Sequence, residues 1–173
     1  MYRVNKRKLA DVIHYIIANC ANKENFGKTL LYKMLYFSDF DYYELYEEPL
    51  TGEQYRKIDY GPAPCHFKDA IKLLEKENKI KKITVAFKGC KQEKYLPLKE
   101  PEVNLTKKEL EVIDSVIGRL SNMSANQVSA FSHNDLPFKA TKYKEIIDYE
   151  LVFYRGPVFS VRGNDNSKNK KAT

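Results

Sequence analysis

The sequence lacks several features that would assign it to a familiar class. Its 173 residues include no tryptophan and only three cysteines, Cys20, Cys65 and Cys90. No run of about 18 uncharged apolar residues occurs, which is the length that a membrane-spanning helix needs. Residues 1–17 mix charge with apolar positions and lack a signal-peptide cleavage site. We therefore expect a soluble, cytoplasmic protein with reduced thiols and no membrane partner.

Catalytic and metal-binding patterns are also missing. The cysteines and histidines show no C-x-x-C or H-x-x-x-H spacing of the kind that zinc sites use. Ser132, His133 and Asp135 carry the residue types of a hydrolase triad, but near neighbours on a chain point in different directions. We therefore predict no catalytic residue, no metal site, no cofactor and no enzymatic activity.

One stretch dominates what is present. It runs from Phe26 to Tyr46, and a helix of that length is about 30 Å long at roughly 1.5 Å per residue. Apolar residues recur at three- and four-residue intervals around most of its circumference, namely Leu30, Leu31, Met34, Leu35, Phe37, Phe40 and Leu45. A helix that is apolar on most sides is buried by its neighbours. We expect this central helix to begin after Asn25 as its N-cap.

Cap residues in the sequence predict where other helices begin. Asn5 can cap a helix that continues to about Cys20, and a further helix is expected to start at a proline within 61–64, to carry Phe67 and to end at about Asn78. Capping boxes at Thr106–Glu109 and Ser124–Gln127 predict two more helix starts. We expect a loop at 136–138 containing a buried aromatic residue and a helical turn within 143–149. Residues 151–154 are compatible with either strand or helix.

Short extended segments complete the fold. Residues 55–60 alternate weakly, and the following Gly61-Pro62-Ala63-Pro64 predicts a turn in which one proline begins the next helix. Residues 83–87 and 93–98, separated by Gly89, predict a hairpin or two edge strands. The sum is a mainly α, α+β fold: a single helical domain at 1–162 around a long central helix, with a small β hairpin or sheet. The polar residues 163–173 are expected to form a disordered tail.

Charge is unevenly distributed along the chain. The formal net charge is +7, and lysines of the expected tail contribute part of it. The N-terminal residues are basic, whereas residues 39–53 contain six carboxylates and no lysine or arginine. Tyrosines crowd the same region, and tyrosine is enriched at protein interfaces. An acidic, tyrosine-rich face would suit a basic protein partner.

Two alternatives involve phosphate. Residues 22–29, NKENFGKT, match the end of a phosphate-binding P-loop except that Asn22 replaces its first glycine. No later apolar strand ends in an aspartate that would hold Mg²⁺, so we interpret Lys28 and Thr29 as a first helical turn. Residues 67–98 form a predicted helix and hairpin rich in lysine, which is the layout of a winged-helix DNA-binding unit. A DNA-binding transcriptional regulator therefore remains the alternative function.

The order of motifs resembles one family. The central helix carries Lys28, Leu30, Tyr32, Leu35, Tyr36 and Phe37, and the weak β segment ends in Tyr60-Gly61-Pro62. A T-K-K-E-L helix start and the stretch from Ser124 to His133 follow in the same order, with Phe138 where the family commonly has tryptophan. Over roughly residues 5–155, this order resembles the SocA-like antitoxins. They contain the Panacea domain, which also occurs in phage-associated proteins.

The resemblance implies one half of a toxin–antitoxin system. It implies a protein that neutralises a toxin, encoded beside it, by direct protein–protein contact and without catalytic residues. Delivery of the toxin to a protease or chaperone is a further possibility that the sequence leaves open, as is nucleic-acid binding. On the acidic aromatic region, the residues that we predict to contact the partner are Tyr36, Asp39, Tyr43, Tyr60, Pro62 and His66.

Overall fold

The computed structural model describes residues 1–102 and 104–163. The helices are α1 (Lys6–Cys20), α2 (Lys28–Tyr46), α3 (Phe67–Lys76), α4 (Lys107–Leu120), α5 (Ala125–His133), α6 (Leu136–Ala140) and the 3₁₀ helix η1 (Tyr149–Tyr154). The strands are β1 (Tyr55–Ile58), β2 (Gly61–Pro64), β3 (Ile80–Phe87) and β4 (Cys90–Pro97). Helices hold 48% of the described residues and strands 15%, so the mainly helical α+β class is confirmed.

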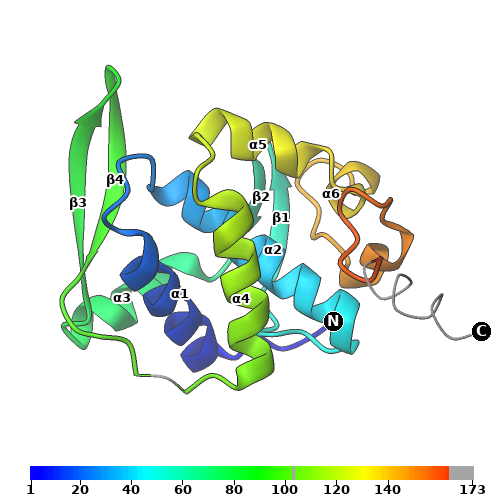
Figure 1. Ribbon diagram of the computed structural model, residues 1–173, viewed down its shortest axis with the longest axis horizontal. Coiled ribbons are helices and arrows are strands. Elements are labelled where there is room, and N and C mark those ends of the chain that lie inside the picture. The colour runs from blue at the N-terminus through cyan, green and yellow to red at the C-terminus, as the bar shows by residue number, and fades with distance from the viewer. Residues whose placement is uncertain (103, 164–173) are drawn as a thin grey trace, which may run out of the picture.

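Helix α2 is the centre of the fold. In Figure 1 it lies behind α4, with α1, α3 and the β3–β4 hairpin on one side and α5 and α6 on the other. Every residue from Leu30 to Glu44 except Tyr32 is buried, as the apolar circumference predicted. The expected N-cap is wrong, because Gly27 occupies that position. Asn25 instead donates from its side chain to the carbonyl oxygens of Ser121 and Met123, both at 2.8 Å, and so joins the start of α2 to the end of α4.

The local cap signals otherwise hold. Asn5 accepts a hydrogen bond from the backbone N–H of Lys8 at 3.0 Å and caps α1. Thr106 and Ser124 form complete capping boxes at the starts of α4 and α5. Each of these side chains pairs a backbone N–H group that a helix terminus otherwise leaves unpaired. The predicted starts of these three helices are therefore confirmed.

The β element consists of two separate antiparallel pairs. Strands β3 and β4 form the predicted hairpin, with Phe87 opposite Cys90 at its tip. Strands β1 and β2 pair from Tyr55 opposite Pro64 to Ile58 opposite Gly61. The prediction that Gly61–Pro64 is a turn leading directly into a helix is wrong, because these residues form β2 and α3 begins at Phe67. Prolines are tolerated here because β2 pairs on one edge with β1.

The chain after α5 returns along β1. The predicted loop at 136–138 is the short helix α6, and the buried aromatic residue expected there is Phe138. Residues 144–147 hydrogen-bond to β1 through backbone bonds of 2.8–3.0 Å between Lys57 and Lys144, between Lys57 and Glu145, and between Tyr55 and Ile147. The segment left open at 151–154 belongs to the 3₁₀ helix η1. This return places residues 142–145 beside the turn between β1 and β2.

No helix within the described residues is both long and apolar enough to cross a membrane. Of the predicted polar tail, all but Gly163 lies outside the described residues.

Candidate functional site

The six residues predicted to contact a partner divide into two groups. Tyr60 lies on the surface with 74% of its area exposed, and His66 is half-buried. The other four are buried, namely Tyr36, Asp39, Tyr43 and Pro62. The prediction that these four form part of an exposed acidic, aromatic surface is therefore wrong. A partner-binding role for Tyr60 and His66 stays a prediction.

The acidic stretch turns inward. Asp39, Asp41, Glu44 and Glu53 are each no more than 1% exposed, while Glu47 and Glu48 remain on the surface. Across the described residues, seven carboxylates are buried against only two buried cations, Lys33 and Arg155. The accessible surface is therefore more basic than the formal charge of +7 suggests. A basic surface favours acidic partners, the opposite of what the sequence pattern indicated.

Asp39 organises the chain that follows α2. Its carboxylate accepts hydrogen bonds from the Thr51 backbone N–H and the Thr51 hydroxyl, both at 2.7 Å, and from the Tyr55 hydroxyl at 2.6 Å. Burial raises the pKa of Asp39 to about 6, although these hydrogen bonds act to lower it. Asp39 thus fixes the start of β1 against α2, which is a structural role.

Glu53 holds His66 from the interior. Its carboxylate accepts the His66 backbone N–H at 2.9 Å and lies 2.6 Å from Nδ1 of the same residue. The Glu53 side chain is fully buried, whereas 31% of the His66 side chain is exposed. This contact fixes the imidazole at the start of α3 with one edge toward solvent.

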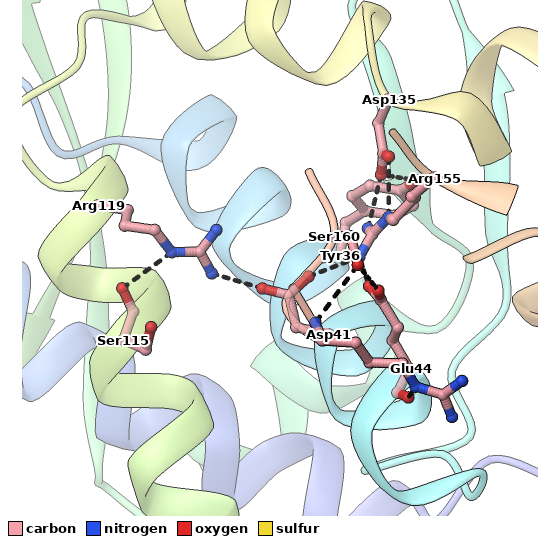
Figure 2. Close-up of polar contacts among 9 residues, drawn as sticks. Tyr36, Asp41, Glu44, Ser115, Arg119, Asp135, Arg155 and Ser160 are labelled. Carbon is pink, nitrogen blue, oxygen red and sulfur yellow. Dashed lines mark hydrogen bonds and ion pairs between the residues drawn. The ribbon is translucent and has the colours of Figure 1, made fainter. Parts of the chain in front are cut away.

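A buried polar cluster is centred on Arg155. Its guanidinium donates to both carboxylate oxygens of Asp135, at 2.9 and 2.7 Å, to Asp41 at 2.8 Å and to Glu44 at 2.9 Å. Figure 2 shows Arg155 enclosed by these three carboxylates, with Arg119 of α4 reaching Asp41 from the other side. The Tyr36 hydroxyl donates to Asp135 at 2.8 Å. The cluster therefore joins the C-terminal segment to α2 and to the α5–α6 junction.

The carboxylates around Arg155 stabilise its charged form. Burial lowers the pKa of a guanidinium, but the charges of Asp41 and Asp135 outweigh that effect and raise the pKa of Arg155. Fully buried ion pairs with good hydrogen-bond geometry are costly to break, because the remaining charge has no partner. This cluster therefore stabilises the packing of the C-terminal segment against α2. No pattern in the sequence around Arg155 predicts these ion pairs.

A second feature lies at the surface, around the turn between β1 and β2. The Ser129 hydroxyl donates to the Tyr60 carbonyl at 3.1 Å, and His133 Nε2 lies 2.9 Å from the Asp59 carbonyl oxygen. Tyr143 is 53% exposed, and the charge of Asp59 raises the pKa of that tyrosine. We call this region the turn surface, and we define it as Arg56, Asp59, Tyr60, His133, Lys142, Tyr143 and Lys144.

The turn surface rests on a buried lysine. Lys33 of α2 is 1% exposed, and its ammonium donates to the Pro62 carbonyl at 3.2 Å. Burial lowers the pKa of Lys33 to about 7. Gly61, with φ of +106°, lies directly over Lys33 and Ser132, and a Cβ atom there would approach the Ser132 hydroxyl to 2.6 Å and Lys33 Cε to 2.7 Å. The turn therefore needs both the backbone freedom and the small size of glycine.

This geometry gives a first prediction. Gly61→Ala should lower the free energy of unfolding by roughly 2–4 kcal/mol, because it adds strain at positive φ and a clash with buried neighbours. Gly89→Ala is the matched control, since Gly89 also has positive φ (+77°) but a Cβ atom added there would meet no atom within 4 Å; about 1 kcal/mol is expected. Equal losses in chemical denaturation would show that the contact with Lys33 and Ser132 is unimportant.

Residues of the two phosphate-related motifs form contacts within the protein itself. Lys28 of the P-loop-like stretch pairs with Glu93 of β4 at 3.3 Å, and Gln92 packs against Gly27. In the predicted winged-helix unit, Lys94 donates to the carbonyl oxygens of Lys23 and Glu24. Exposed lysines remain along the β3–β4 hairpin at positions 81, 82, 88 and 91. Among the described residues, no group of three or more histidine, cysteine, aspartate or glutamate side chains is placed to hold a metal ion.

Comparison with known proteins gives one result. No curated protein and no solved structure matches the chain. The family model described as "Antitoxin SocA-like, Panacea domain" matches residues 31–137, which run from the first turn of α2 to the start of α6. This range contains Lys33, the β1–β2 turn and Asp135, whereas Arg155 lies beyond it. Since the match spans more than half of the chain, the protein belongs to the SocA-like antitoxin family with a Panacea domain.

Proposed function

We propose that this protein is an antitoxin that neutralises a toxin, encoded beside it, by binding to it directly and without catalysis. The observation that carries the proposal is the family match across residues 31–137, the part of the chain that holds the central helix and most of the turn surface. The basic accessible surface and the exposed tyrosines Tyr60 and Tyr143 support a binding role. Occlusion of the toxin's active face is the proposed mechanism.

We further propose that residues 1–162 act as one unit. The C-terminal segment lies outside the family match, yet Arg155 forms its ion pairs with Asp41 and Glu44 of α2. Arg162 donates to the Glu44 carbonyl at 2.5 Å. Truncation after the family match would therefore remove the cation that these buried carboxylates need.

Co-expression tests the function. Each gene adjacent to the one for this chain is expressed alone and together with it, and growth is followed. We expect one neighbour to arrest growth alone, to be tolerated with the antitoxin, and to co-elute with it in a stoichiometric complex. Rescue that needs an added protease or chaperone would favour delivery over occlusion. The absence of any toxic neighbour, or rescue without a complex, would contradict the proposal.

A DNA-binding regulator is the second candidate, and the exposed lysines of the β3–β4 hairpin favour it. Figure 1 shows this hairpin extending away from the helical body. If DNA binds there, a labelled duplex should shift at low salt, and Lys88→Glu with Lys91→Glu should abolish the shift. Without a shift of the wild-type protein at low salt, the DNA hypothesis fails.

A further inference from the structure

We infer that the turn surface is where this protein contacts its toxin, and that it takes an acidic face of that protein. The inference rests on the proposed antitoxin function and adds the location and the chemistry of the contact. Three observations support it. Two exposed tyrosines, Tyr60 and Tyr143, extend from backbone that hydrogen bonds hold in place, and most of the charged side chains around them are basic. The carboxylate of Asp59 beside them would repel a nucleic acid.

The aromatic pair is held in place from below. Tyr60 exposes 74% of its area at the tip of a two-residue connection between β1 and β2. Its carbonyl accepts from Ser129, and the carbonyl of Asp59 lies against His133, so α5 fixes the turn from one side. Gly61 packs on buried Lys33 beneath it. A tyrosine presented by a fixed backbone loses little conformational entropy on binding, which is how anchor residues gain affinity.

The second tyrosine comes from the returning segment. The backbone N–H of Lys144, the next residue, donates to the Lys57 carbonyl at 2.9 Å, which places Tyr143 near the turn that carries Tyr60. Its own segment is joined to β1 by backbone hydrogen bonds, and Arg56 donates to the Lys144 carbonyl at 2.6 Å. Two exposed tyrosines therefore extend from the turn and from a segment that hydrogen bonds join to β1. Large aromatic side chains that remain exposed on a rigid surface are typical of interface hot spots.

Charge around the pair is mainly positive. Arg56, Lys142 and Lys144 are exposed on the turn surface, and Lys139 is exposed on the adjacent α6. Glu145 is the exposed acidic side chain of the same returning segment, and Asp59 is that of the turn. A basic rim around an aromatic centre attracts an acidic partner and speeds its association.

The charge of Asp59 favours a protein over a nucleic acid as the partner. Asp59 is exposed directly before Tyr60, and its charge also acts on Tyr143, so a phosphate backbone that covered the two tyrosines would approach a negative charge. A folded protein can place a hydrogen-bond donor against Asp59 and carboxylates against the rim, whereas a chain of uniform negative charge cannot. We therefore assign the surface to a protein partner.

Binding measurements test the inference, with the purified toxic neighbour from the co-expression experiment as the probe. Tyr60→Ala and Tyr143→Ala should each raise Kd roughly tenfold or more, whereas Tyr60→Phe should retain most of the affinity. Lys142→Glu with Lys144→Glu should slow association at low salt, and the difference should shrink at high salt. All of these side chains are exposed, so circular dichroism and Tm should match the wild type.

Matched controls use exposed residues on the β3–β4 side of the molecule. Leu98→Ala, at 53% exposure, and Lys81→Glu with Lys88→Glu should leave Kd within about twofold. If the wild-type protein binds the toxin but the turn-surface variants behave like these controls, the inference fails while the proposed function stands. If the wild type binds no toxic neighbour, both fail together. Low-salt binding of a labelled duplex or RNA that Lys142→Glu with Lys144→Glu abolishes would overturn it in favour of a nucleic acid.

Discussion

Replacing Arg155 with methionine should lower the free energy of unfolding by about 3–5 kcal/mol, the typical cost of removing one partner from a buried ion pair. Methionine fills similar space, but Asp41, Glu44 and Asp135 lose a shared cation. Asp41 keeps Arg119, while Asp135 keeps the Tyr36 hydroxyl. The measurement is chemical denaturation at pH 7, followed by far-UV circular dichroism.

The loss of unfolding free energy in Arg155→Met should also depend on pH. Burial already raises the pKa of Asp41, and the charge of Arg155 is the foremost influence that lowers it. Without Arg155, the folded state should bind protons more tightly than the unfolded state. Stability of the variant is then lost as pH rises through that raised pKa, so the deficit should shrink as pH is lowered from 7 toward the ordinary aspartate pKa of about 4. A deficit that stays constant over this range would mean that Arg155 acts through packing alone.

Arg162→Met is the control for this experiment. Arg162 pairs with Glu47 at 3.3 Å and donates to the Glu44 carbonyl, and 45% of its side chain is exposed. Exposed ion pairs contribute roughly 0–1 kcal/mol and a hydrogen bond about 1 kcal/mol, so we expect a loss of no more than about 2 kcal/mol. A loss as large as that of Arg155→Met would show that any contact between α2 and the C-terminal segment has the same effect.

Replacing Lys33 with methionine should stabilise the protein at neutral and acid pH. Burial lowers the pKa of Lys33 from 10.5 to about 7, so the unfolded chain binds more protons than the folded one between these values. The stability of the wild type therefore rises with pH across this window, and the full penalty is present below pH 7. At about 1.4 kcal/mol per pH unit over the roughly 3.5 units between the two pKa values, that penalty is on the order of 5 kcal/mol.

Methionine removes this penalty but also the hydrogen bond to the Pro62 carbonyl, which costs about 1 kcal/mol. The net gain at pH 6 should be roughly 3–4 kcal/mol, and it should vanish near pH 10. Denaturation of both proteins from pH 6 to pH 10 measures the difference, with exposed Lys68→Met as the control for loss of a charge. A difference that is independent of pH would contradict a neutral lysine beneath the turn.

Local sequence signals predicted the fold well, for a physical reason. Asn5, Thr106 and Ser124 pair backbone groups within three residues of themselves, so their effect does not depend on the rest of the chain. The apolar circumference of α2 likewise determines that it is buried, whatever surrounds it. The two prolines of β2 misled the prediction, since pairing with β1 outweighed their preference for a helix start.

The candidate site was less accessible to sequence reasoning. Because α2 is buried on nearly all sides, its periodicity cannot say whether Asp39 and Tyr43 face solvent. Their orientation depends on partners such as Thr51 and Glu150. Tyr60 was predicted to contact the partner. Tyr143, which also belongs to the turn surface, was not predicted, because the sequence around it shows no regular pattern.

By itself, the sequence determined the starts of α1, α4 and α5, the burial of α2, the mainly helical class and the family. Short-range hydrogen bonds and hydrophobic periodicity depend only on residues close together in the sequence. Only the tertiary structure decided that the acidic stretch turns inward and that a basic surface with exposed tyrosines faces outward. Arg155 meets Asp135 across 20 residues and Asp41 across 114. Such pairings depend on how distant segments pack, and burial then decides which charges a partner can reach.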